Sequence, residues 1–273
     1  LFNSSVVNFN TGDPSATGVR ILGASRLSVK DCDNIEYTIN GIAAYGDMAT
    51  GSADPDVLMD GNTLICSSTV SGDEYALNMC LGATGTISNN TVTDAANRAV
   101  LVSFSDNINV TGNTIANQAF GIFYFNATGG TASGNQIDDG GTGVYLYNAT
   151  GVTVKGNTIT DQTGDGITLN PASNCFIGIT GSGNGNTITN SGNNGILVSS
   201  GTGNSICENI ITNFTNSGIF ITSNANQVLS NQIADNTGYC NNGIALDGAS
   251  SNIINGNTIS NIHYSLFDNT ITK

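Results

Sequence analysis

The sequence predicts one all-β domain, a parallel β-helix in which about 22 residues and three short strands make up each of roughly ten turns. Three observations predict this fold. An asparagine with an apolar residue two positions later recurs along the chain, and a glycine followed by isoleucine or valine recurs between its copies. The segments alternate apolar and polar residues over only three to five positions, a period that belongs to strands and cannot be helical.

The first strand of each turn begins at the recurring asparagine. Successive copies lie 22 to 29 residues apart, so the longer intervals contain insertions. The copies are Asn62, Asn90, Asn113, Asn135, Asn157, Asn186, Asn209, Asn231 and Asn257. In a parallel coil equivalent strands pair in register about 4.8 Å apart, so every repeat position becomes a column. We expect these asparagines to form a buried ladder of side-chain hydrogen bonds, and we assign them no chemistry.

The other two strands of each turn follow from the same repeat. The second strand opens at the glycine, as at Gly121, Gly143 and Gly166, and the third leads into the next asparagine, as in residues 152–154. Their alternate apolar residues should point into the coil, where they stack in columns to form the core.

These "GNTI" and "GI-x-L" repeats resemble the right-handed parallel β-helix proteins of the pectate-lyase superfamily, in particular those with NosD-like, PbH1-type repeats. The resemblance covers residues 18–260 and implies the fold. The superfamily includes lyases, hydrolases, epimerases, tailspikes, adhesins and surface-layer proteins, so the fold does not select a function. We expect one domain over residues 1–273, with an N-terminal segment (1–17), the coils (18–260) and a C-terminal segment (261–273).

The charge of the chain excludes some partners. Twenty acidic residues against six basic ones give a net charge of −14, which excludes nucleic acid because phosphate binding needs clustered Lys and Arg. No apolar run approaches the roughly 18 residues of a membrane helix, so we expect no membrane span. The chain begins at Leu1 without a methionine, as processed exported proteins do, and we expect an extracellular or cell-surface location.

Cysteines and glycosylation sequons also fit export. The six cysteines are even in number and lack metal-binding spacing, which favours disulfides in an oxidising compartment. We expect Cys66 to pair with Cys80 across a local insertion, and Cys175 with Cys207 on neighbouring repeats. Sequons for N-glycosylation stand at Asn3, Asn89, Asn109, Asn126, Asn148 and Asn213.

A second column of Asp or Asn stands four residues after each ladder asparagine. Such residues shape turns by bonding to their own backbone, which explains the column without any ligand. The column is most acidic at Asp139 and Asp161 on adjacent turns, with Asp138 and Asp165 close in sequence. A Ca²⁺ ion held by Asp138, Asp139 and Asp161 is the alternative, since it would relieve the repulsion between carboxylates. No other cofactor is expected.

An aromatic patch is predicted on the outside of the second strand. Phe123 with Phe125, and Tyr145 with Tyr147 one turn later, occupy outward positions. Outward aromatic residues are unusual on a soluble solenoid. They could stack on sugar rings, lie under a loop or form a subunit interface, and their extension by apolar residues in nearby turns favours the last two.

The requirements of catalysis are only partly met. Hydrolysis of a glycan needs two carboxylates, which Asp139, Asp161 and Asp165 could supply, and "TGDGI" at 163–167 is similar to a segment of polygalacturonase-like hydrolases. The Gly-His-Gly and Arg-Ile-Lys motifs of those enzymes are missing, and the one histidine, His263, lies far along the chain. A lyase needs cations and a base, which this acidic chain scarcely offers.

The sequence therefore favours an exported structural protein that self-associates into a filament, sheath or surface layer through its termini and the aromatic patch. Two alternatives stay open. One is a polysaccharide lyase or glycoside hydrolase that uses Asp139, Asp161 and Asp165, with Tyr145 and Tyr147 as sugar platforms. The other is a non-catalytic glycan-binding adhesin that depends on the two tyrosines.

Overall fold

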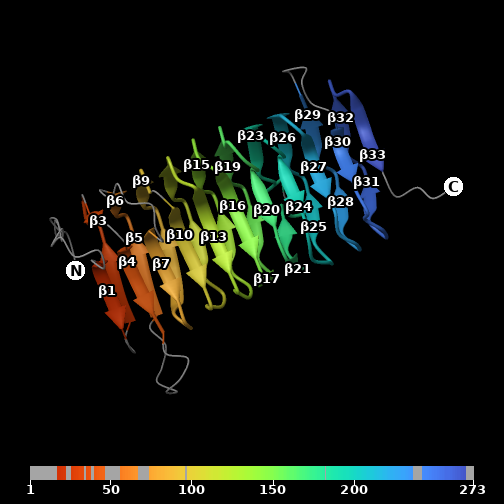
Figure 1. Ribbon diagram of the computed structural model, residues 1–273. Coiled ribbons are helices and arrows are strands. Elements are labelled where there is room, and N and C mark those ends of the chain that lie inside the picture. Colours follow the sequence, from red (N-terminus) through yellow and green to blue (C-terminus); the bar gives the residue numbers. More distant parts are fainter. Residues whose placement is uncertain are drawn as a thin grey trace.

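The computed structural model describes residues 17–22, 26–33, 35–37, 40–46, 56–66, 74–95, 97–181, 183–235 and 242–268. The chain winds as a parallel β-helix, with its first turns at one end and its last turns at the other (Figure 1). Each described turn but the last contributes one strand to each of three long parallel sheets, as the three-strand repeat predicts, and the last contributes β33 alone.

Sheet 1 has eleven strands and is built from the segments that open at the recurring glycine. Its strands are β1 (Thr17–Leu22), β4 (Asn40–Tyr45), β7 (Tyr75–Cys80), β10 (Arg98–Ser103), β13 (Phe120–Phe125), β16 (Thr142–Tyr147), β20 (Ile167–Leu169), β24 (Ile196–Val198), β27 (Ser217–Ile221), β30 (Asn242–Leu246) and β33 (Tyr264–Asp268). Because β33 continues the sheet, the coil extends past residue 260, where the sequence predicted its end.

Sheets 2 and 3 have ten strands each. Sheet 2 consists of β2 (Arg26–Lys30), β5 (Asp56–Asp60), β8 (Thr84–Ser88), β11 (Asn109–Thr111), β14 (Thr131–Ser133), β18 (Thr153–Lys155), β22 (Phe176–Ile177), β25 (Ser205–Cys207), β28 (Gln227–Leu229) and β31 (Ile253–Asn255). Sheet 3 consists of β3 (Ile35–Tyr37), β6 (Thr63–Cys66), β9 (Thr91–Thr93), β12 (Thr114–Ala116), β15 (Gln136–Asp138), β19 (Thr158–Thr160), β23 (Thr187–Ser191), β26 (Ile210–Phe214), β29 (Gln232–Ala234) and β32 (Thr258–Ser260). A short pair, β17 (Ala149–Thr150) and β21 (Ala172–Ser173), joins two of the turns.

The core is the stack of inward columns. Ile115, Ile137 and Ile159 pair in register on successive strands of sheet 3, and all three side chains are buried. Burial of each such side chain contributes about 1.5–3 kcal/mol. No helix in the described part of the chain is long and apolar enough to cross a membrane.

The predicted asparagine ladder is confirmed. The Oδ1 atom of Asn135 accepts hydrogen bonds from the backbone N and from Nδ2 of Asn113, both at 2.9 Å, and Asn157 accepts the equivalent bonds from Asn135 at 3.0 and 2.9 Å. The sequence did not predict a second, shorter ladder, in which Asn204 and Asn226 repeat this arrangement.

The glycine column near the start of the sheet 1 strands packs tightly against the next turn. A Cβ atom on Gly121 would lie 2.5 Å from the carbonyl oxygen of Gly143 on the next turn and 2.7 Å from Cγ2 of Ile137. A side chain on Gly121 would force these turns apart, whereas the same column accepts the small side chains of Ala76 and Ala99 in earlier turns.

The predicted disulfides are not formed. Among the described residues, Cys32, Cys66, Cys80, Cys175 and Cys207 are free and buried, while Cys240 lies outside the described residues. Cys175 lies opposite Asn204 in the second ladder, whereas Cys207 lies three residues further along β25. Three residues of a strand span about 10 Å, more than a disulfide can bridge.

The other predicted pair is separated by the fold. Cys66 pairs in register with Tyr37 in sheet 3. Cys80 ends β7 in sheet 1, where its thiol lies 3.5 Å from the carbonyl oxygen of Ala44. Cys80 lies five residues, about 16 Å, from the first residue of β7, so the fold separates it from Cys66 in sheet 3.

Candidate functional site

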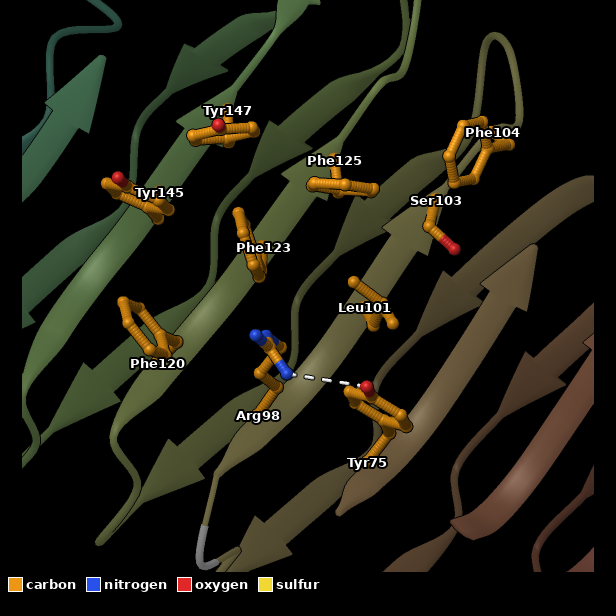
Figure 2. A pocket seen from close by; sticks show the side chains of 10 residues that line it. All are labelled: Tyr75, Arg98, Leu101, Ser103, Phe104, Phe120, Phe123, Phe125, Tyr145 and Tyr147. Carbon is orange, nitrogen blue, oxygen red and sulfur yellow. Dashed lines mark hydrogen bonds between the residues drawn. The ribbon is translucent and has the colours of Figure 1, made fainter. Parts of the chain in front are cut away.

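An aromatic groove crosses the outer face of sheet 1 over β7, β10, β13 and β16 (Figure 2). In-register pairing aligns Leu101 of β10 with Phe123 and Tyr145, and Ser103 with Phe125 and Tyr147. Ten residues line the groove: Tyr75, Arg98, Leu101, Ser103, Phe104, Phe120, Phe123, Phe125, Tyr145 and Tyr147.

The hollow arises from a change of side-chain size along two columns. The columns carry rings on β13 and β16 but only Leu101 and Ser103 on β10. Figure 2 shows Leu101 between the ring of Phe123 and the Tyr75 side chain of β7, and Ser103 beside Phe125 and Phe104 at the other end of β10. Leu101 and Ser103 form the floor of a groove of about 440 Å³, a volume within the range of ligand pockets.

The rings pack on one another and hold the wall of the groove rigid. Phe125 and Tyr147 stack with centroids 5.4 Å apart and planes 13° from parallel, and Phe123 lies 5.0 Å from Tyr145. Phe104, 41% exposed, meets Phe125 edge-on at 5.4 Å. Such pairs add about 0.5–1.5 kcal/mol beyond the area they bury.

Arg98 closes the other end of the groove. Its Cζ atom lies 4.8 Å from the ring centroid of Phe123, 5.4 Å from that of Tyr75 and 5.7 Å from that of Phe120. Its Nη1 donates a 3.4 Å hydrogen bond to the hydroxyl of Tyr75, drawn as the dashed line in Figure 2. The guanidinium and the rings of Phe120 and Tyr145 pack around Phe123, and that outward ring is only 6% exposed.

The sequence predicted the outward direction of Phe123, Phe125, Tyr145 and Tyr147, and the structure confirms it. It missed five further residues of the groove: Tyr75, Arg98, Ser103, Phe104 and Phe120. Tyr75, Arg98 and Phe120 share one column, immediately before the small residue that opens each strand of sheet 1. Aligning that position across turns would have found them.

The predicted acidic residues lie elsewhere, at the corner between sheets 3 and 1. Asp161 lines a separate cleft of about 670 Å³ and accepts a 2.8 Å hydrogen bond from Asn190. Asp139 and Asp161 both have positive φ, 49° and 55°, so the column shapes the turn as the first interpretation of it predicts. Asp138 accepts a hydrogen bond from the hydroxyl of Thr160.

Asp165 is buried and fully engaged by its neighbours. Its carboxylate accepts bonds from Thr168 Oγ1 at 2.9 Å, Asn193 Nδ2 at 2.8 Å, and Asn194 N and Nδ2 at 3.0 and 2.9 Å. These bonds fasten the loop after β23 to the preceding turn. Neither Asp165 nor Asp139 lines the cleft of Asp161, so the three predicted catalytic acids do not meet there.

Metal and sugar attachment stay predictions. In the described part of the chain no three or more His, Cys, Asp or Glu residues form a group that could hold a metal ion, so Asp138, Asp139 and Asp161 are not gathered as one calcium site. Four of the sequon asparagines, Asn89, Asn126, Asn148 and Asn213, have positive φ and serve as turn residues. Asn109 is exposed on β11, and Asn3 lies outside the described residues.

The repeat and the coil define a class of protein, the parallel β-helix proteins built from short stacked repeats. Within it, the chain belongs to the family of the periplasmic copper-binding protein NosD, which matches residues 3–150, 55–237 and 142–271. No curated protein matches the chain.

Several solved structures share the fold. The A-module of the mannuronan C-5 epimerase AlgE6 from Azotobacter vinelandii has a TM-score of 0.61 at 13% identity, over 90% of this chain and 87% of that one. DFA-IIIase from Arthrobacter chlorophenolicus A6 has a TM-score of 0.57 at 11% identity, over 94% and 78% of the two chains. The periplasmic alginate epimerase AlgG has a TM-score of 0.53 at 13% identity, over 88% and 70%. At these identities the likeness concerns the fold alone.

Proposed function

We propose that this protein binds a polysaccharide outside the cytoplasm, holding a sugar ring in the aromatic groove of sheet 1. The groove itself is the observation that carries the proposal. It is concave, walled by aromatic rings and provided with a few polar groups, the combination expected of a small-ligand site. The periplasmic description of the family and the carbohydrate-active enzymes among its structural neighbours support the location and the ligand class.

A sugar matches both kinds of surface that the groove offers. The C–H face of a pyranose is apolar and packs on an aromatic ring, while its hydroxyls need hydrogen-bonding partners. The partly exposed ring of Phe125 and the exposed ring of Phe104 stand beside the low floor of Leu101 and Ser103. The hydroxyls of Ser103, Tyr75 and Tyr145 and the guanidinium of Arg98 supply donors around that floor.

Binding without cleavage fits the groove best. Its ten lining residues include no carboxylate and no histidine, so the acid and base of a glycoside hydrolase are not among them. Asp139, Asp161 and Asp165 lie at the corner instead, and the four bonds to Asp165 give it a structural role. Of the alternatives drawn from the sequence, the non-catalytic glycan-binding one is therefore favoured.

Self-association through the aromatic patch has less support. A hollow suits a ligand that enters it, whereas a homotypic interface would need a second copy of the chain with a matching ridge. None of the three structures named above is described as a filament or surface-layer protein. The self-associating building block stays a prediction without a supporting observation.

Copper, named in the family description, does not fit the described residues. Copper prefers thiolate, thioether and imidazole ligands. The described cysteines are buried and do not form a metal-binding group, and Met59 and Met79 lie in the core. His263 meets Tyr264 edge-on, with ring centroids 4.5 Å apart, far along the chain from these residues. We therefore derive no copper chemistry for this part of the chain.

The test is a glycan array probed with the wild type and two matched variants. Ser103→Phe adds a ring beside Phe125 and fills the floor of the groove, whereas Ser133→Phe adds the same ring on sheet 2, away from it. We expect the wild type and Ser133→Phe to bind the same glycans and Ser103→Phe to bind none. Equal binding by all three would place the sugar elsewhere, and no binding by the wild type would end the proposal.

A further inference from the structure

The groove differs in charge from the molecule around it. The chain carries a net charge of −14, yet the one charged residue among the ten that line the groove is Arg98. We propose that the groove is selective for an anionic sugar, whose carboxylate or sulfate is bound by the guanidinium of Arg98. This inference rests on the glycan-binding function proposed above and names the class of glycan.

The position of Arg98 is held by its neighbours. Its Cζ atom lies within 5.7 Å of the ring centroids of Phe123, Tyr75 and Phe120, and its Nη1 bonds to the Tyr75 hydroxyl. Glu74, whose carbonyl oxygen accepts a hydrogen bond from the backbone N of Arg98, is itself buried and does not line the groove. The side chain is thus fixed at the end of the floor formed by Leu101 and Ser103 rather than free to swing into solvent (Figure 2).

Arginine at this place suits an oxyanion. Its planar guanidinium offers donors in a fork that matches two oxygens of a carboxylate or sulfate. Apolar walls reduce the local dielectric and strengthen the attraction. Because the rings already hold the guanidinium, little side-chain entropy remains to be lost when an anion binds.

The negative charge of the whole protein does not cancel this effect. At physiological ionic strength, charges more than about 8 Å away are largely screened. Asp139, Asp161 and Asp165 lie at the corner between sheets 3 and 1, outside the groove lining. The negative net charge therefore does not exclude an acidic glycan from this groove, where the one charged lining residue is the positive Arg98.

The experiment uses pairs of oligosaccharides that differ only in charge. The array carries uronate oligosaccharides beside their carboxyl-reduced forms, and sulfated oligosaccharides beside their desulfated forms. The proteins are the wild type, Arg98→Gln, Arg98→Lys and Lys155→Gln. The last removes one positive charge from β18 on sheet 2 and serves as the matched control. Far-ultraviolet circular dichroism checks that each variant is folded.

The inference predicts a preference that only Arg98 controls. The wild type and Lys155→Gln should bind the charged member of a pair at least about tenfold more tightly, the effect of one charge-assisted hydrogen bond. Arg98→Gln should bind both members alike, and Arg98→Lys should keep part of the preference. The uronate and sulfate pairs show which anion the site prefers. High salt should weaken binding of the charged member alone.

Two results separate the inference from the function on which it rests. Equal binding of charged and neutral members by the wild type would overturn the anionic selectivity and leave glycan binding in place. A preference that survives in Arg98→Gln would also overturn it, because the charge would then be recognised elsewhere. No binding to any glycan would overturn both proposals.

Discussion

Replacing Asn135 with alanine should destabilise the coil more than almost any other single change. Asn135 is fully buried, and its side chain makes four hydrogen bonds. Its Oδ1 accepts from the backbone N and Nδ2 of Asn113, and its Nδ2 donates to Asn157 Oδ1 and to the carbonyl oxygen of Val110, each at 2.9 Å. Alanine removes all four bonds and leaves a gap inside the turn.

The expected loss follows from the groups left behind. The backbone N–H of Asn113 and one N–H of its side chain lose their acceptor inside the core. Each buried polar group left without a partner costs about 1–3 kcal/mol, and the gap adds to this. We expect the free energy of unfolding to fall by about 3–5 kcal/mol, the upper end of what single substitutions do.

The assay is equilibrium unfolding in urea, followed by far-ultraviolet circular dichroism. Asn109→Ala is the matched control, because Asn109 is the same residue type on the exposed side of β11, next to Val110. That control should change the free energy by less than about 0.5 kcal/mol. If Asn135→Ala costs less than about 1 kcal/mol, the ladder is not an important source of stability and the reasoning from its bonds is wrong.

Three further predictions concern the acids, a buried thiol and metal. Asp165→Ala should lower the free energy of unfolding by about 2 kcal/mol, because its hydrogen bonds are lost, while glycan binding persists. If the variant kept its stability and lost activity on a glycan, a catalytic role for Asp165 would be favoured instead. Burial raises the pKa of the Cys80 thiol to about 12, so the unfolded chain loses this proton first as the pH rises. The stability that Cys80 contributes is therefore present below about pH 9 and is lost between about pH 9 and about pH 12. Urea unfolding at pH 8 and at pH 10.5 measures this effect. Between these two pH values, the free energy of unfolding of Cys80→Ala should fall by about 1–2 kcal/mol less than that of the wild type. Removal of divalent ions with EDTA should leave the melting temperature unchanged, because Asp138, Asp139 and Asp161 do not form a metal-binding group; a fall of several degrees would restore the calcium prediction.

The coil could be predicted because its information is local and repeated. A 22-residue repeat with period-2 alternation fixes which residues share a column, so the asparagine ladder and the outward direction of Tyr145 and Tyr147 follow directly. The same reasoning shows that the acidic column forms turns, as the positive φ of Asp139 and Asp161 confirms.

The groove and the cysteines needed more than the repeat. The hollow exists because Leu101 and Ser103 stand in columns that carry aromatic rings on the next two turns. Finding it requires a comparison of equivalent positions on successive turns rather than of neighbours along the sequence. The proposed link between Cys175 and Cys207 failed because sequence distance does not give the register inside a turn with insertions. The bonds of Asp165 to Asn193 and Asn194 depend on the loop after β23, which the repeat does not specify.

The most direct test of the account is a crystal structure of the protein with a glycan selected on the array. We expect a sugar ring over Leu101 and Ser103, against the ring of Phe125, with its polar groups toward Arg98 and Tyr75. A sugar bound instead at the corner cleft of Asp161 and Asn190 would contradict it. So would a lattice-independent assembly, seen by electron microscopy, in which a second copy of the chain fills the groove.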